Sequence, residues 1–215
     1  MNRQNAVEEY EKALKEGLRE YRECVQRKIE PNPIVLDDML MPEEIENSIN
    51  VGLVNIPINR IVGIKNAGRV SAFTPSFRPL MELETEFASK WISLCADHLA
   101  EGIRDPIECF EYLGNFYVQE GNKRVSVLNH FGALRISAKV TRILPPKNDD
   151  PRIVAYYEFL EFYKDSGIYE VQYRIPGNYA KLLEKIDFPT EEKWTEDDRR
   201  RFRAGFYYFN EALSA

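Results

Sequence analysis

The residues best suited to chemistry lie together in the stretch Glu120-Gly121-Asn122-Lys123-Arg124. Gly121 permits a sharp turn that a residue with a Cβ would resist. We expect a short helix to begin directly after this glycine, so that its first unpaired N–H groups point beyond the turn. Lys123 and Arg124 add positive charge at the same place. These features predict an anion site, and phosphate is the obvious anion.

Glu120 gives the same stretch two further interpretations. In the plainer one, Arg124 pairs with Glu120 at a solvated helix start, and no ligand is involved. In the other, Glu120 is the catalytic carboxylate, holding Mg²⁺ while Arg124 contacts a phosphate. It is the only acid inside the motif. The local pattern leaves these interpretations open beside the anion site.

The flanking residues predict the elements that position this motif. Residues 116–118 favour a strand before the turn. Val125, Leu128 and Phe131 fall on one face of the expected helix, and Gly132 suits its end. A strand–turn–helix unit therefore presents the motif.

A second basic stretch precedes the motif. The expected loop at residues 57–80 holds Arg60, Lys65, Arg69 and Arg78, and no acid follows until Glu82. From residue 121 to residue 147 there are again six basic residues and no acid. In a chain of net charge -6, these two stretches make a local positive cleft if the fold brings them together.

The remaining pattern predicts three domains: an N-terminal helical arm at residues 1–49, a core at 50–145 and a C-terminal helical extension at 146–215. A long helix over residues 5–28 shows an apolar stripe, and we expect it to pack on the core or on a second subunit. A helix over 85–100, a hairpin around Leu113-Gly114 and a strand over 134–144 complete the core. Helices are expected after Asp150-Pro151, over 178–186 and over 195–212.

Composition narrows the class of protein. With 44% apolar and 30% charged residues of both signs, the chain of 215 residues is typical of a soluble globular protein. Its acidic balance excludes a chain that coats nucleic acid over its whole surface. Three scattered cysteines, without a Cys/His cluster, argue against a zinc site and fit a reducing compartment. Without a signal peptide or a transmembrane-length apolar run, we expect a cytoplasmic protein with no membrane partner. The chain can be the front part of a longer protein.

Five segments, in order, resemble the ParB/sulfiredoxin-like domain of the ParB-like nuclease superfamily, a bacterial-type domain. Ile56-Pro57-Ile58-Asn59-Arg60-Ile61 resembles its opening strand and turn, and residues 69–79 its loop with arginine and proline. The segment 88–107 is similar to a helix that ends in glycine and runs on to a Pro-Ile pair. Residues 111–132 resemble its strand, Gly-x-x-Arg turn and helix, and 135–142 its closing strand.

The resemblance implies an α+β fold with a small mixed sheet and packed helices, here extended by the long N-terminal helix and the C-terminal helices. It also implies that Gly121 and Arg124 cradle nucleotide phosphates, with Asn122 and Lys123 in the same turn. The arginine-bearing loop would bring Arg78 and Arg69 to those phosphates. Sulfiredoxins carry a reactive cysteine where this chain has Asn122, so we do not expect sulfinic-acid reduction. The helix-turn-helix of ParB proteins is not evident.

Three functions follow from these observations. The first is a binding module for a phosphate ligand, either a nucleoside triphosphate with magnesium or a nucleic-acid backbone, in a regulatory, DNA-associated or transcriptional role. The second is a magnesium-dependent nuclease or nucleotide-dependent phosphotransferase that uses Glu120. The third is a degenerate domain used for docking, or for homo-oligomerisation through the first helix. Whether the protein is an enzyme stays open at this point.

Overall fold

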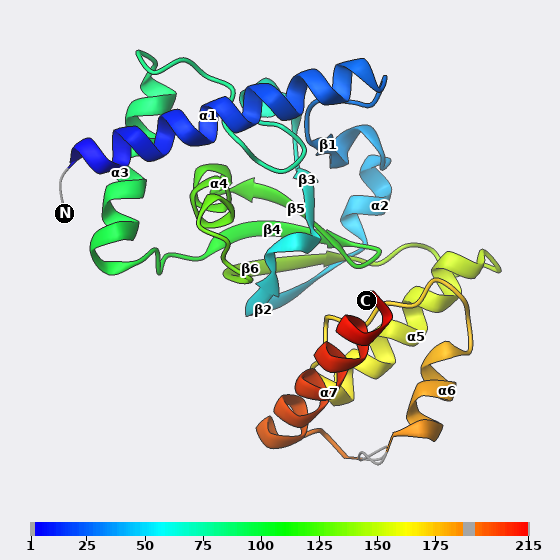
Figure 1. The fold of residues 1–215 in the computed structure, drawn as a ribbon. Coiled ribbons are helices and arrows are strands. Elements are labelled where there is room, and N and C mark those ends of the chain that lie inside the picture. The colour runs from blue at the N-terminus through cyan, green and yellow to red at the C-terminus, as the bar shows by residue number, and fades with distance from the viewer. Residues whose placement is uncertain (1–2, 187–191, 215) are drawn as a thin grey trace. The chain divides into compact units, whose positions relative to one another are not determined.

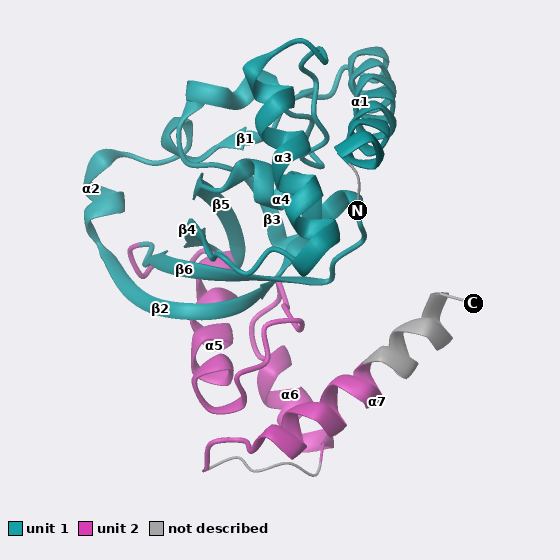
Figure 2. Ribbon diagram, turned by 90° about the vertical axis from the view of Figure 1, so that its left-hand side faces the viewer, with its two compact units in different colours: residues 1–145 teal, residues 146–215 magenta. Residues whose placement is uncertain are grey.

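The computed structural model describes residues 3–186 and 192–214 and divides the chain into two compact units. Unit 1 spans Met1–Pro145 and unit 2 spans Pro146–Ala215 (Figure 2). The expected α+β class is confirmed, with a mixed sheet, a long N-terminal helix and a C-terminal helical extension (Figure 1). No described helix combines the length and the apolar character needed to cross a bilayer.

The sheet of unit 1 has the strand order β1-β3-β5-β4-β6-β2. β3 lies parallel to β1 and β5, β4 lies parallel to β6, and the β4–β5 and β2–β6 pairs are antiparallel. The sheet is therefore mixed, with β5 near its centre. The elements of unit 1 are α1 (Arg3–Gln26), β1 (Ile34–Val35), α2 (Pro42–Glu46), β2 (Ser48–Pro57), β3 (Ile61–Ile64), α3 (Glu86–Glu101), β4 (Ile107–Tyr112), β5 (Asn115–Glu120), α4 (Asn122–His130) and β6 (Arg135–Ile143).

The β4–β5 hairpin is confirmed around Leu113 and Gly114. Both residues have positive φ, 49° and 79°, which matches the turn that best continues the twist of two antiparallel strands. In β5, Phe116, Tyr117 and Val118 are all buried, because an inner strand is covered on both faces. This burial carries β5 through the core to the turn at Gly121.

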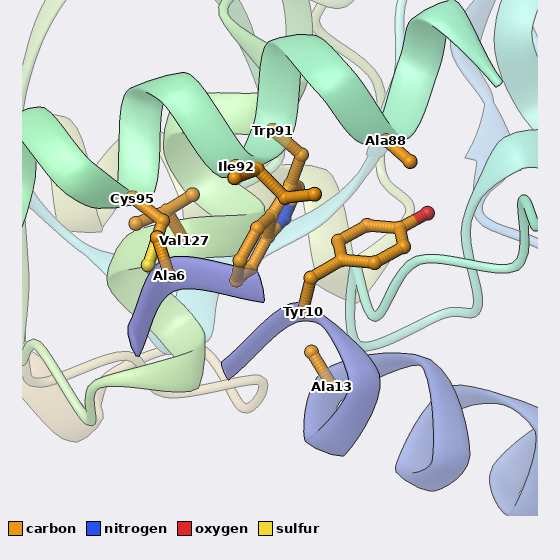
Figure 3. Packing of buried hydrophobic residues seen from close by; sticks show 8 residues of the cluster. All are labelled: Ala6, Tyr10, Ala13, Ala88, Trp91, Ile92, Cys95 and Val127. Carbon is orange, nitrogen blue, oxygen red and sulfur yellow. The ribbon is translucent and has the colours of Figure 1, made fainter. Parts of the chain in front are cut away.

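A buried cluster joins α1, α3 and α4 (Figure 3). Tyr10 of α1 lies edge-on to Trp91 of α3, with ring centroids 5.2 Å apart. The Trp91 indole donates a hydrogen bond of 2.9 Å to the Ser126 hydroxyl of α4. Burying two such rings stabilises the packing by several kcal/mol, on the order of 2 kcal/mol each. The cluster consists of Ala6, Tyr10, Ala13, Ala88, Trp91, Ile92, Cys95 and Val127.

The apolar stripe of α1 is only partly buried, which differs from the sequence pattern. Its buried residues are Ala6, Tyr10, Ala13 and Gly17, spaced for one helical face. Small residues dominate this face because α1 approaches its neighbours closely: a Cβ on Gly17 would lie 2.4 Å from the Pro79 carbonyl oxygen. The larger side chains later in the helix are exposed instead: Leu18, Tyr21 and Val25.

Unit 2 contains α5 (Pro151–Ser166), α6 (Asn178–Lys185) and α7 (Glu196–Ser214). The Asp150 side chain accepts a hydrogen bond of 2.8 Å from the backbone N–H of Arg152 and caps α5, as expected. Gly167, in the left-handed region, ends it. The capping box between Thr195 and Asp198 is confirmed at the start of α7. The core of the unit is aromatic and includes Phe159, Phe162, Tyr179, Trp194 and Phe202.

The basic run at the start of α7 is matched by carboxylates. Arg199 lies 2.5 Å from Glu196, and Arg203 lies 3.0 Å from Glu170. Arg200 and Arg201 lie beside acids one turn earlier in the helix. The run is therefore a mixed-charge helix face rather than an unbroken basic one.

Candidate functional site

The motif at Gly121 adopts the predicted strand–turn–helix form. β5 ends at Glu120, Gly121 has φ 102°, and α4 begins at Asn122. A Cβ at Gly121 would lie 2.6 Å from Cγ2 of Ile107, so the turn has no room for a side chain. Glycine is required here both by its dihedral angle and by this close approach.

A cavity of about 580 Å³ opens in front of this turn, and we call it the α4-start cavity. No side chain caps the first turn of α4, so its leading N–H groups keep their donor capacity. Ile64 and Val118 from the sheet and Phe73 and Leu94 give the cavity apolar walls. Its described lining is Ile64, Asn66, Gly68, Arg69, Phe73, Lys90, Leu94, Val118, Gln119, Glu120, Gly121, Asn122, Lys123 and Arg124.

Four cationic side chains line the cavity, against a single carboxylate among its described residues, that of Glu120. They come from three segments: Arg69 from the loop after β3, Lys90 from α3, and Lys123 with Arg124 from α4. The fold thus brings together the loop and the motif that the sequence singled out. It adds Lys90, whose local sequence shows only the polar face of an amphipathic helix.

The cations of the cavity lie close enough to repel one another. The pKa of Lys123 is lowered, first by burial and then by the charges of Arg69 and Lys90, with Glu86 opposing the shift. The Lys123 ammonium also lies 4.6 Å from the ring centroid of Phe87. An anion in the cavity would relieve this repulsion, because it favours the charged form of each neighbour.

The guanidinium of Arg124 is hydrogen-bonded to other groups of the protein. It donates to the carbonyl oxygen of Pro106 and, at 3.3 Å, to the carboxylate of Glu120. Only 20% of its side chain is exposed. The plainer interpretation of the motif, an arginine paired with Glu120, is therefore part of the structure. Arg124 contributes charge to the cavity while holding the turn to the strand at residues 107–112.

Arg69 is better placed to meet a ligand. It is exposed and lies in a short 3-10 segment, Ala67–Ala72, where its φ and ψ of -142° and 21° break the helical path. The Asn66 side chain accepts a 3.3 Å hydrogen bond from the Gly68 N–H and caps this segment. The loop therefore presents Arg69 from a defined turn at the cavity.

Arg78 lies elsewhere. Its guanidinium contacts Glu16 and Glu20 of α1 at 3.0 Å each, and it borders a separate small cavity of about 60 Å³. The family resemblance implies a phosphate contact for Arg78 through the loop that it shares with Arg69. The loop turns between the two residues, and the α1 carboxylates hold Arg78 away from the α4-start cavity.

Glu120 and Asn122 complete the predicted set. The Glu120 side chain is 69% exposed and pairs with Arg124. The part of the chain that the structure describes contains no group of three or more acidic, histidine or cysteine side chains arranged to hold a metal. The amide oxygen of Asn122 is buried and has no hydrogen-bond partner among the described residues. Asn122 thus borders the cavity but turns this oxygen into the protein.

Comparison with known proteins gives little beyond this geometry. No protein-family model matches the chain, and no curated protein matches it. Among solved structures, sulfiredoxin from Arabidopsis thaliana is similar over 41% of this chain and 82% of its own, with 22% identity and a TM-score of 0.29. This similarity is too slight to carry an argument about the fold family or the site.

Proposed function

We propose that unit 1 is a binding module for phosphate-bearing ligands, with the α4-start cavity as its site. The observation that carries the proposal is the convergence of Arg69, Lys90 and Lys123 on the uncapped first turn of α4. Backbone N–H groups and cations at one helix start favour a phosphate over a carboxylate or an apolar ligand. The apolar walls suit the organic part of such a ligand.

The ligand class is a phosphate ester, either a nucleoside triphosphate or a nucleic-acid backbone. Calorimetric titration with CTP, ATP and GTP, each with magnesium, and with a short single-stranded oligonucleotide separates these sources. One nucleotide binding well above the others indicates a defined pocket. Binding to the oligonucleotide alone indicates a backbone contact and a DNA-associated, regulatory role.

The sharpest test variant is Arg69→Gln, because Arg69 is exposed whereas Arg124 also supports the turn. We expect Arg69→Gln to weaken nucleotide binding about tenfold, with an unchanged melting temperature. Arg104→Gln is the matched control, since Arg104 is exposed and does not line the cavity. Equal affinities for wild type and Arg69→Gln, or no binding of any phosphate ester, would refute the proposal.

Glu120 supports a second candidate, a hydrolytic or phosphotransfer activity with magnesium. Its carboxylate borders the cavity and is exposed enough to accept a hydrated metal ion. If the site hydrolyses its nucleotide, Glu120→Gln should abolish turnover and retain binding. Turnover that survives this change would rule out the carboxylate as the catalytic group.

The exposed end of α1 supports a third candidate, self-association. Leu18, Tyr21 and Val25 are between 37% and 53% exposed and lie on one face of the helix. Removing residues 1–30 would also remove the buried first half of α1, so substitution is the cleaner test. We expect Leu18→Glu with Val25→Glu to reduce the mass in solution by sedimentation if this face joins two copies. An unchanged mass argues against it.

A further inference from the structure

Unit 2 contains a second cavity of about 620 Å³, between α6 and α7, which we call the α6–α7 cavity. It lies within the size range of small-molecule sites, roughly 300–1,000 Å³. Ten described residues line it: Tyr173, Asn178, Lys181, Leu182, Lys185, Ile186, Arg201, Phe202, Gly205 and Phe206.

The cavity has an apolar floor built from residues of α6, α7 and the chain just after α6. Leu182 lies in the last turn of α6, and Ile186, in an extended conformation, directly follows the helix. Phe202 and Phe206 lie one turn apart on α7, with their rings stacked 5.9 Å apart at an interplanar angle of 12°. Among the described residues, a Cβ on Gly205 would meet no atom within 4 Å, so they leave this side of α7 open.

The rim of the cavity is cationic. Lys181 and Lys185 project from successive turns of α6, and Arg201 from α7. No acidic residue occurs among the described residues that line the cavity, although the whole chain is acidic. Arg201 lies 3.8 Å from Asp198, a long ion pair, and within the described part of the chain no ion pair involves Lys185.

We propose that the α6–α7 cavity binds an amphipathic anion, of which a medium-chain fatty carboxylate is the simplest member. The floor suits an alkyl chain, because burying each methylene favours binding, and the rim suits a carboxylate. This site belongs to unit 2 alone and does not depend on the proposed phosphate site.

Calorimetry of the full chain with dodecanoate, below its micelle concentration, tests the proposal. Affinity should rise about tenfold from decanoate to dodecanoate, because two more methylenes are buried. Dodecan-1-ol should bind about tenfold more weakly than dodecanoate, since it lacks the charge that the rim recognises. Equal binding of the alcohol and the carboxylate, or no binding of either, overturns the proposal.

Two variants locate the site. Lys181→Glu with Lys185→Glu should weaken dodecanoate binding at least about tenfold, whereas Lys164→Glu, an exposed lysine of the same unit outside the cavity, should leave it unchanged. Gly205→Phe should fill the open side of the cavity and block binding. The helix should tolerate this change, because phenylalanine has a higher helix propensity than glycine. Full affinity in both the double variant and Gly205→Phe overturns the assignment.

A fluorescence readout ties binding to this place. The ring centroids of Trp194 and Phe202 are 5.3 Å apart, and Phe202 lines the cavity, whereas Trp91 belongs to unit 1. In the variant Trp91→Phe, Trp194 is the remaining tryptophan. Its fluorescence emission should shift as dodecanoate is added, and the affinity obtained from this shift should equal the affinity from calorimetry. Emission that stays constant while heat is released places the ligand elsewhere. Binding of an acidic amphipathic helical peptide without dodecanoate binding would also overturn the proposal and point to a protein partner.

Discussion

The two cavities have similar volumes, about 580 and 620 Å³, yet they offer different chemistry. In the α4-start cavity the cations stand beside backbone N–H groups at a glycine turn. In the α6–α7 cavity they stand at the rim of an aromatic and aliphatic floor. Both cavities are positively charged, but we expect them to bind different ligands. The groups beside the cations decide whether a compact anion or an amphipathic anion is recognised.

Gly121→Val should have the largest effect, and of the two cavities it should disturb only the α4-start cavity. The new side chain needs a positive φ and collides with Ile107, so we expect a loss of about 3 kcal/mol in the free energy of unfolding, with loss of phosphate-ester binding. Urea denaturation measures it. Gly132→Val is the matched control: it has φ 70° but no atom within 4 Å of the Cβ, so its loss should be smaller. Equal losses would contradict the steric argument.

Glu20→Gln should weaken the packing of the loop at residues 74–78 against α1. Burial raises the pKa of Glu20, and hydrogen bonds from Ser76, Arg78 and Thr74 outweigh it, so the pKa lies below its usual value. The carboxylate thus stabilises the fold above its unfolded pKa of about 4.3 and loses this contribution as pH falls through the folded value. We expect a cost of about 2 kcal/mol at pH 7.

The same variant should have a flatter stability profile than wild type below about pH 4.5. Thermal unfolding between pH 3 and pH 7 measures both effects, and dodecanoate affinity at pH 7, compared between the variant and wild type, serves as the reference from unit 2. An equally steep acid loss in Glu20→Gln and wild type would show that other carboxylates govern it.

Salt should separate the two cavities. Raising ionic strength from 0.05 M to 0.5 M should weaken nucleotide binding about tenfold, because exposed charges such as Arg69 and Lys90 are screened. Dodecanoate binding should fall by about threefold at most, since methylene burial supplies most of its affinity. Titration in sodium chloride measures both, and a steeper loss for dodecanoate would reverse the comparison.

Alkaline pH should weaken only the nucleotide site, by about threefold between pH 7 and pH 9.5. The lowered pKa of Lys123 means that it loses its proton earlier than an ordinary lysine, and an anion binds the protonated form better. Lys123→Arg keeps the charge and should remove the decline. A decline of the same size in Lys123→Arg would assign it to another group.

The sequence predicts most strongly those features that arise from neighbouring residues. The turn at Gly121, the β4–β5 hairpin and the caps at Asp150 and Thr195 each depend on a few consecutive side chains, and the structure contains all of them. They were predictable because their geometry is settled locally.

Features decided by distant residues were not predictable in the same way. Lys90 joins the cavity only because α3 packs beside α4, and Arg78 is drawn away by carboxylates about 60 positions earlier in the chain. The buried face of α1 follows small residues such as Ala13 and Gly17, since close approach counts for more there than side-chain size. A prediction from hydrophobic periodicity alone would instead assign the larger apolar residues of α1 to the buried face.

The contacts of α1 also have a consequence for the order of synthesis. This helix is translated before the rest of unit 1, yet Glu9 pairs with His130, which is 121 residues later, and Tyr10 donates to the carbonyl of Met81. The face of α1 that is buried in the folded protein therefore stays exposed to solvent until most of unit 1 has been translated. The abundant Glu, Lys and Arg residues of α1 suit that interval, because they keep a nascent helix dispersed before its partners exist.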